Sequence, residues 1–203
     1  MTKIKFCGIT SIQDIEASNL LLPDYIGFVF APQSRRYITP DLAEKLKTRL
    51  DPRIRATGVF VNEKPELMAR LANEAVIHTI QLHGQETEQT IKALRSLTAA
   101  PVLQAFTIRA EDDLLRADAS SADYILLDSG AGTGTVFDWA LIRNRIRRPF
   151  FLAGGLDPEN VSEAIHTLSP YGVDVSSGIE TGGKKDINKM AAFAAAVRKE
   201  EMT

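Results

Sequence analysis

Eight short apolar segments recur along this chain, and the intervals between them are long enough to hold a helix. Most of these segments are rich in β-branched and aromatic residues, which favour strands. The segments are Ile4–Cys7, Tyr25–Phe30, Ala56–Val61, Val76–Leu82, Val102–Phe106, Tyr124–Asp128, Phe150–Ala153 and Val173–Ser176. Because strand and helix alternate eight times, the sequence predicts an α/β fold, the closed (β/α)8 or TIM barrel.

The length of the chain restricts how this barrel can be built. The chain has 203 residues, which is close to the lower end of about 200 residues for the fold. The loops must therefore be short, and we expect one compact domain over residues 1–203. Helices are expected near residues 11–21, 40–50, 65–74, 86–97, 110–117, 138–145, 158–167 and 187–200.

Four Pro-containing turns predict where helices open, because Pro fits the first turn of a helix. They are Thr39-Pro40-Asp41, Asp51-Pro52, Lys64-Pro65-Glu66 and Asp157-Pro158-Glu159. An open, doubly wound sheet would give similar buried parallel strands. The number of units argues against it, as does the lack of a G-x-G-x-x-G motif after the first strand.

Charge and cysteine content limit the classes of partner and compartment. The net charge is −2, which leaves no basic field for nucleic acid. No apolar run approaches the 18 or more residues of a membrane span. A single cysteine excludes an internal disulfide and favours the cytoplasm. We therefore expect a small-molecule substrate, with neither a nucleic-acid nor a membrane partner.

Glycine-rich segments follow the seventh and eighth expected strands. Gly154 and Gly155 follow the seventh, and Ser177 and Gly178 follow the eighth. In this fold the active site lies on the face formed by the loops after the strands, and phosphate is commonly held by these two loops. Glycine lets backbone N–H groups approach an anion. Tight turns alone would explain one such cluster, but two consecutive clusters favour phosphate binding.

Two chemically reactive side chains also stand at expected strand ends. Cys7 ends the first strand and Asp128 ends the sixth. A lone Cys is often a small core residue, but a thiolate at the active-site face could act as a base or nucleophile. An acid after four apolar residues is costly to bury without a partner or a task. The alternative for Asp128 is a cap of the following turn.

Four further residues are open to two interpretations each. Arg35 and Arg36 follow the second strand, where a guanidinium could pair with a carboxylate or simply be solvated. His83 ends the fourth strand and could contact the substrate or be a satisfied hydrogen-bonding side chain. Asp174 lies inside the eighth strand. It could order a substrate hydroxyl at the barrel mouth or form a buried salt bridge.

These residues belong to a series of motifs that runs from Lys5 to about Lys189. The motifs are Lys5-Phe6-Cys7-Gly8-Ile9-Thr10, Gly27-Phe28-Val29-Phe30, Ser34-Arg35-Arg36, Gly58-Val59-Phe60-Val61-Asn62, Gln81-Leu82-His83-Gly84, Leu127-Asp128-Ser129, Gly132-Thr133-Gly134, Phe137-Asp138-Trp139, Leu152-Ala153-Gly154-Gly155-Leu156, Glu159-Asn160-Val161, Gly172-Val173-Asp174-Val175-Ser176-Ser177-Gly178-Ile179-Glu180 and Gly183-Lys184-Lys185-Asp186. Together they resemble phosphoribosylanthranilate isomerase, the (β/α)8 enzyme of tryptophan biosynthesis. Phe6 stands where the family more often has a smaller aliphatic residue, and it is expected to face the wall of the barrel.

The resemblance implies an Amadori rearrangement of an aminoaldose, N-(5′-phosphoribosyl)anthranilate, to an aminoketose. It assigns the general base to Cys7 and the general acid to Asp128. The substrate nitrogen would serve as the electron sink, so no metal or organic cofactor is expected. Cys7 would then need a pKa below the usual value of about 8.5, and Asp128 one above about 3.9.

The resemblance also favours Arg36 over Arg35 as the partner of the anthranilate carboxylate. We expect the loop after the second strand to lie across the barrel mouth from the phosphate loops. The family includes monomers and homodimers, and the sequence does not choose between them.

Two alternatives remain. An isomerase for another phosphoribosyl aminoaldose, as in histidine biosynthesis, would characteristically carry Asp where Cys7 stands. A non-catalytic phosphosugar-binding barrel would keep the glycines but would have no reason to keep both Cys7 and Asp128.

Overall fold

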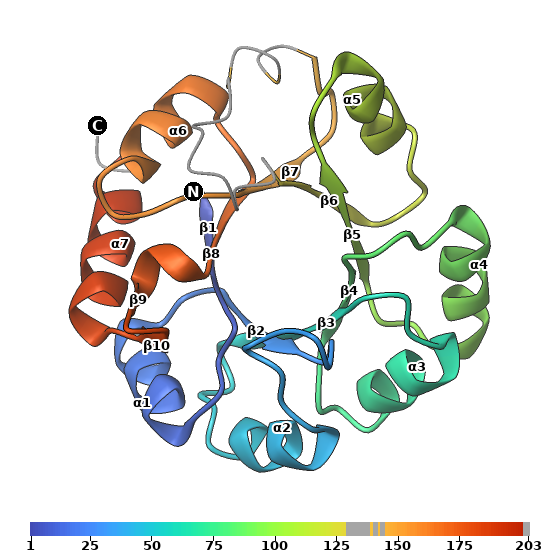
Figure 1. Cartoon of the computed structure of the whole chain (residues 1–203), viewed down its shortest axis with the longest axis horizontal. Helices are drawn as coiled ribbons and strands as arrows, with labels where there is room; N and C mark the ends of the chain where they lie inside the picture. The colour runs from blue at the N-terminus through green and yellow to red at the C-terminus, as the bar shows by residue number, and fades with distance from the viewer. Residues whose placement is uncertain (129–138, 140–141, 143–144, 201–203) are drawn as a thin grey trace.

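Eight parallel strands form a closed barrel in the computed structural model, which describes residues 1–128, 139, 142 and 145–200. Each strand pairs with its neighbours in sequence, and β1 closes the ring against β8 (Figure 1). The strands are β1 (Lys3–Cys7), β2 (Tyr25–Val29), β3 (Arg55–Phe60), β4 (Thr79–Leu82), β5 (Val102–Thr107), β6 (Tyr124–Asp128), β7 (Phe150–Ala153) and β8 (Gly172–Val175). The predicted (β/α)8 barrel is therefore confirmed.

The helices form a ring outside the strands (Figure 1). They are α1 (Ile12–Leu21), α2 (Pro40–Lys47), α3 (Pro65–Asn73), α4 (Glu88–Leu97), α5 (Glu111–Asp118), α6 (Val161–Leu168) and α7 (Ile187–Lys199). After β8 come a short 3-10 helix, η2 (Ser177–Ile179), and a hairpin of β9 (Glu180–Thr181) and β10 (Lys184–Lys185). None of the helices described has the length and apolar character needed to cross a membrane.

Several element boundaries differ from the sequence prediction. Val76 and Ile77 belong to the turn after α3, where their N–H groups bond to the carbonyl of Leu71, so β4 starts only at Thr79. Asp51-Pro52 forms a turn that leads directly into β3 rather than a helix. The predicted helix over 138–145 falls largely outside the described residues, as do Ser129 and the 132–134 motif.

The opening of α6 was predicted three residues too early. Asp157 Oδ1 accepts hydrogen bonds from the backbone N–H groups of Glu159 and Asn160, while Asn160 Oδ1 accepts one from Asp157. These reciprocal bonds hold the segment after Pro158 as a turn, so the helix begins at Val161. The turns at Pro40 and Pro65 do open helices, as predicted.

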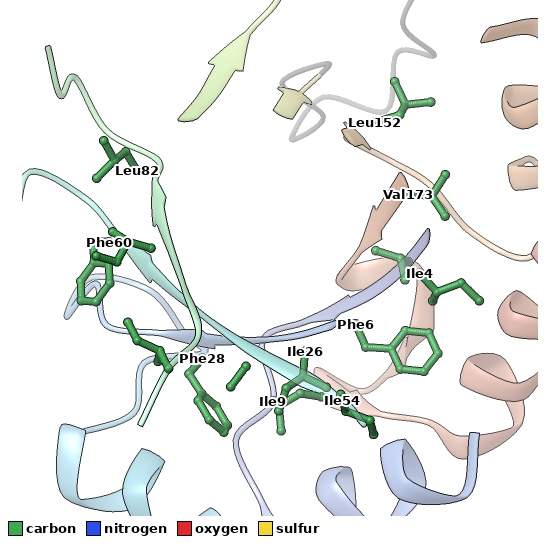
Figure 2. Close-up of a cluster of buried hydrophobic side chains, with 14 of the residues drawn as sticks. Ile4, Phe6, Ile9, Ile26, Phe28, Ile54, Phe60, Leu82, Leu152 and Val173 are labelled. Atoms are coloured by element: carbon green, nitrogen blue, oxygen red, sulfur yellow. The ribbon is translucent and has the colours of Figure 1, made fainter. Parts of the chain in front are cut away.

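Alternate residues of each strand face opposite sides of the barrel wall. Outward-facing residues such as Ile4, Phe6, Ile26 and Phe28 form the large core between strands and helices (Figure 2). Phe6 is fully buried and meets the ring of Phe193 on α7 edge to face, at a centroid distance of 6.4 Å. The larger side chain is thus accommodated at the wall, as expected.

The barrel interior contains polar side chains as well as apolar ones. Lys5, Thr57, Thr79, Gln81 and Asp174 are buried at strand positions that alternate with the outward-facing core residues. Buried polar groups are costly unless they are hydrogen-bonded or have a task. This polar interior lies beneath the carboxyl ends of the strands, where the candidate site is found.

Candidate active site

A pocket of about 350 Å³ opens at the carboxyl ends of the strands. This volume is within the usual range for small-molecule sites. All of the predicted site residues except Gly178 line it: Cys7, Arg36, His83, Asp128, Gly154, Gly155, Asp174 and Ser177. They come from seven different elements and loops, so only closure of the barrel brings them together.

Cys7 at the end of β1 lines the pocket together with Asp174, which forms a buried ion pair with Lys5. Lys5 lies two residues earlier, on the same side of the strand, and is fully buried. Its Nζ is 2.8 Å from Asp174 Oδ2 on the neighbouring strand β8. The other carboxylate oxygen, Oδ1, is buried and has no partner among the described residues. Asp174 therefore forms a buried salt bridge, one of the two predicted alternatives, and it also lines the pocket.

The thiol of Cys7 differs from the expected pre-formed thiolate. Burial raises the pKa of Cys7, and although the Lys5 ammonium opposes this, the pKa stays above its usual value. The Asp174 carboxylate raises it further, while Lys185 lowers it. Burial therefore favours the neutral thiol of Cys7 over its thiolate, because removal from water disfavours the charged form.

Asp128 at the end of β6 faces His83 from the end of β4. The distance from His83 Nε2 to Asp128 Oδ2 is 3.4 Å. The Gln81 amide nitrogen lies 2.9 Å from His83 Nδ1. With Gln81 as the donor, the proton of neutral His83 is on Nε2, the nitrogen that faces Asp128. His83 is thus both hydrogen-bonded and exposed to the pocket.

Arg36 is held by a carboxylate that the sequence interpretation did not single out. Its Nε and Nη2 donate to the two oxygens of Glu180 at 2.6 and 2.9 Å. Glu180 also accepts hydrogen bonds from Arg35 and from the buried Lys185. Burial tends to raise the pKa of Glu180, but the hydrogen bonds from Arg36 and Lys185 outweigh it, so the pKa is lowered.

The position of Arg36 in the barrel corrects one sequence expectation. The loop after β2 does not lie across the mouth from the loop after β8, because β2 and β8 flank β1 on either side. Arg36 instead contacts Glu180, just after η2. The side chain of Arg36 lines the pocket and is 20% exposed, whereas that of Arg35 is 61% exposed.

The two glycine-rich loops, which follow β7 and β8, contact each other at the pocket. Gly154 and Gly155 have φ values of 92° and 67°, which residues with a side chain rarely adopt. Ser177 begins the short helix η2. Gly178 does not line the pocket but packs against the other loop, since a Cβ there would lie 2.0 Å from the carbonyl oxygen of Leu156. Gly178 therefore permits close contact between the loops.

Sequence interpretation missed Lys5, Gln81, Glu180 and Lys185 as individual site residues. Lys5 and Gln81 are polar residues inside apolar strands, two positions before Cys7 and His83. Because residues two apart on a strand face the same side, this spacing could have identified them as neighbours of the site. Glu180 and Lys185 lie in the hairpin after β8, where no such alternation is present. Among the described residues, no group of three or more His, Cys, Asp or Glu side chains could hold a metal ion.

Comparison with known proteins decides the family. The model of the N-(5′-phosphoribosyl)anthranilate (PRA) isomerase family matches residues 4–196. The chain belongs to this PRA isomerase family. It is 42% identical over 195 residues to the N-(5′-phosphoribosyl)anthranilate isomerase of Endomicrobium trichonymphae, covering 94% of this chain and 95% of that one.

Solved PRA isomerase structures share the fold over nearly the whole chain. The Thermotoga maritima phosphoribosyl anthranilate isomerase has a TM-score of 0.89 and 38% identity, covering 98% of this chain and 100% of its own. Another PRA isomerase, with the same identity and coverage and a TM-score of 0.87, was solved in complex with reduced 1-(o-carboxyphenylamino)-1-deoxyribulose 5-phosphate. A further T. maritima structure, with a TM-score of 0.86 and again the same identity and coverage, describes monomers generated from a dimeric PRA isomerase.

Proposed function

We propose that this protein converts N-(5′-phosphoribosyl)anthranilate to 1-(2-carboxyphenylamino)-1-deoxyribulose 5-phosphate, with Cys7 as general base and Asp128 as general acid. The reaction is the isomerisation step of tryptophan biosynthesis. The observation that carries the proposal is the joint presence of Cys7, Asp128 and the two glycine-rich loops around one pocket.

The chemistry needs one acid and one base on different sides of the sugar. Asp128 in its protonated form would donate to the furanose oxygen, and the ring opens as the nitrogen lone pair forms a C1′=N bond. That bond acidifies the C2′ proton, which the thiolate of Cys7 would remove. The resulting enolamine loses its hydroxyl proton and gains a proton at C1′, which gives the ketone without any external electron acceptor.

The order of the strands is consistent with an acid and a base on different sides of the sugar. Cys7 on β1 and Asp128 on β6 are separated by β7 and β8, whose loops would hold the phosphate through Gly154, Gly155 and Ser177. The phosphate would thus lie on the arc between acid and base. Backbone N–H groups near a short helix suit an anion, and the glycine residues allow it to approach closely.

Arg36 and Asp174 would orient the two remaining polar parts of the substrate. A guanidinium has five N–H donors, and Glu180 takes two of those of Arg36. The remaining edge suits the anthranilate carboxylate. The unpartnered Oδ1 of Asp174 would accept a hydrogen bond from a ribose hydroxyl, which would relieve the cost of its burial. His83 would contact the substrate beside Asp128.

We further propose that the protein acts in the cytoplasm, as a monomer or homodimer, without nucleic-acid or membrane partners. The single cysteine and the net charge of −2 support this setting. Light scattering tests the oligomeric state, since one relative is described as dimeric.

Loss of the anthranilate fluorescence of N-(5′-phosphoribosyl)anthranilate tests the proposed activity directly. We expect multiple turnovers with the parent protein and none with the double variant Cys7→Ser/Asp128→Asn. Turnover of the histidine-pathway aminoaldose instead would identify a different isomerase. Binding of the substrate without turnover would identify a non-catalytic barrel, and either result would contradict the proposal.

A further inference from the structure

Cys7 poses a chemical problem that its immediate surroundings address. A general base must lose its own proton before it can accept one, but burial disfavours the charged thiolate. The side chains whose charges act on Cys7 are Lys5 on β1, Asp174 on β8 and Lys185 on β10. Of these, Lys5 is the fully buried cation that shares the inner side of β1 with Cys7.

We propose that Lys5 is the residue that activates Cys7, because its buried ammonium stabilises the thiolate at the end of the same strand. The inference rests on the proposed role of Cys7 as general base and names the residue that makes that role feasible. Lys5 does not itself react. It is a positioning residue that acts through Cys7.

The position of Lys5 on the strand fixes this relationship. Side chains at i and i+2 of a strand point to the same side. Lys5 is paired in register with Asp174, and its Nζ is held 2.8 Å from Asp174 Oδ2. The ammonium is therefore fixed by the barrel wall beneath Cys7, with no exposed surface through which water could screen its charge.

Asp174 has two opposing effects in this arrangement. It keeps Lys5 charged: burial tends to lower the pKa of Lys5, but the carboxylate and Cys7 outweigh it, and the pKa is raised. It also disfavours a second negative charge nearby, and so raises the pKa of Cys7. A substrate hydroxyl that donates a hydrogen bond to Asp174 Oδ1 would withdraw part of the negative charge of the carboxylate. The Lys5 ammonium would then stabilise the Cys7 thiolate more strongly.

The proton balance is simple. Ionisation of Cys7 releases one proton to solvent through the open pocket, while Lys5 keeps its three N–H protons throughout. The thiolate then accepts the C2′ proton of the substrate and becomes a thiol again. Lys5 changes only the stability of the charged form of Cys7.

Cys7 is the only cysteine in the chain, so its ionisation can be measured without substrate. The rate of alkylation by iodoacetamide follows the thiolate population, and its midpoint on a pH profile reports the pKa of Cys7. An opposite charge at short range typically shifts a pKa by about 1–3 units. We expect Lys5→Met to raise the midpoint by about one unit or more.

Lys5→Met alone leaves Asp174 as a buried unpaired acid and could fail to fold. A second pair of variants avoids this difficulty: Asp174→Asn, and Lys5→Met/Asp174→Asn, in which both charges are removed together. We expect the midpoint to fall in Asp174→Asn relative to the parent and to rise by about one unit or more in the double variant relative to Asp174→Asn. Circular dichroism checks that each variant is folded.

Lys185→Met is the matched control, because it removes another buried lysine of the same site, one that is paired with Glu180 and lowers the pKa of Cys7 less than Lys5 does. Its midpoint should rise less than that of the Lys5 variants. The proposal is overturned if removing Lys5 leaves the midpoint unchanged in the folded variants, or if Lys185→Met produces an equal rise. These results are independent of turnover. An active Cys7→Ser variant would instead refute the role of Cys7 and leave the coupling to Lys5 intact.

Discussion

Arg36 and Glu180 form a two-point ion pair that joins the loop after β2 to the segment after β8. The contacts of 2.6 and 2.9 Å use both carboxylate oxygens and two nitrogens of the guanidinium. The two residues are 144 positions apart in the sequence. Planar pairs of this kind fix orientation as well as distance, so Glu180 determines which edge of Arg36 faces the pocket.

Replacing Cys7 by Ser should abolish most of the turnover and leave KM nearly unchanged. A hydroxyl is a far weaker base than a thiolate, and loss of a general base typically costs about 10²–10⁴ in rate. Steady-state kinetics on the anthranilate-linked substrate measures both constants. A kcat within a few-fold of the parent value would show that Cys7 has a purely structural role.

Asp128→Asn should lower kcat to a comparable extent. The amide keeps the shape of the carboxyl group but cannot deliver a proton to the ring oxygen. The pH dependence of kcat in the parent should show two ionisations, and the Asn variant should lose one of them. Near-normal activity of this variant would exclude Asp128 from the mechanism.

Arg36→Ala should raise KM more than it lowers kcat, because a contact to the substrate carboxylate is present in ground and transition states alike. Arg36→Lys should restore only part of the affinity, since an ammonium lacks the planar fork. Arg35→Ala is the control, because Arg35 pairs with the same Glu180 but is largely exposed. A raised KM in the Arg35 variant alone would identify the other arginine as the ligand.

Glu180 should make the stability of the protein sensitive to acid. Its pKa is lowered from the usual 4.5 in the folded state, so its stabilising effect is present above about pH 4.5 and is lost as the pH falls through the folded value. The Tm of the parent should therefore drop more between pH 7 and about pH 3 than that of Glu180→Gln. At pH 7 the variant should be less stable by roughly 3 kcal/mol, because Lys185 loses its buried partner. Equal acid sensitivity would contradict this role.

Gly178→Ala should destabilise the fold without adding or removing a polar group. The new Cβ would lie 2.0 Å from the Leu156 carbonyl oxygen, and relief of such overpacking costs about 1–3 kcal/mol. Urea denaturation measures the loss. Gly182→Ala serves as the comparison, because no atom lies within 4 Å of its added Cβ and only its φ of 60° opposes the change. An equal or smaller loss at Gly178 would show that the loops separate freely.

Much of the fold and part of the site follow from local sequence alone. Apolar, β-rich runs specify strands through burial on both faces, and their eightfold alternation with helices leaves few alternatives to a barrel. Cys7 and Asp128 could be singled out because the carboxyl ends of parallel strands converge on one face. For the same reason the glycine pairs after β7 and β8 could be assigned to one site.

Only the tertiary structure decided which charges meet and what surrounds them. Closure of β8 on β1 puts Asp174 beside Lys5, 169 positions away, and brings Glu180 to Arg36. Burial raises the pKa of Cys7, whereas the sequence led us to expect a pKa below the usual value. The sequence determines which residues reach the mouth of the barrel, because strand periodicity is local. Partner choice and desolvation depend on register and packing between distant segments, which no local pattern contains.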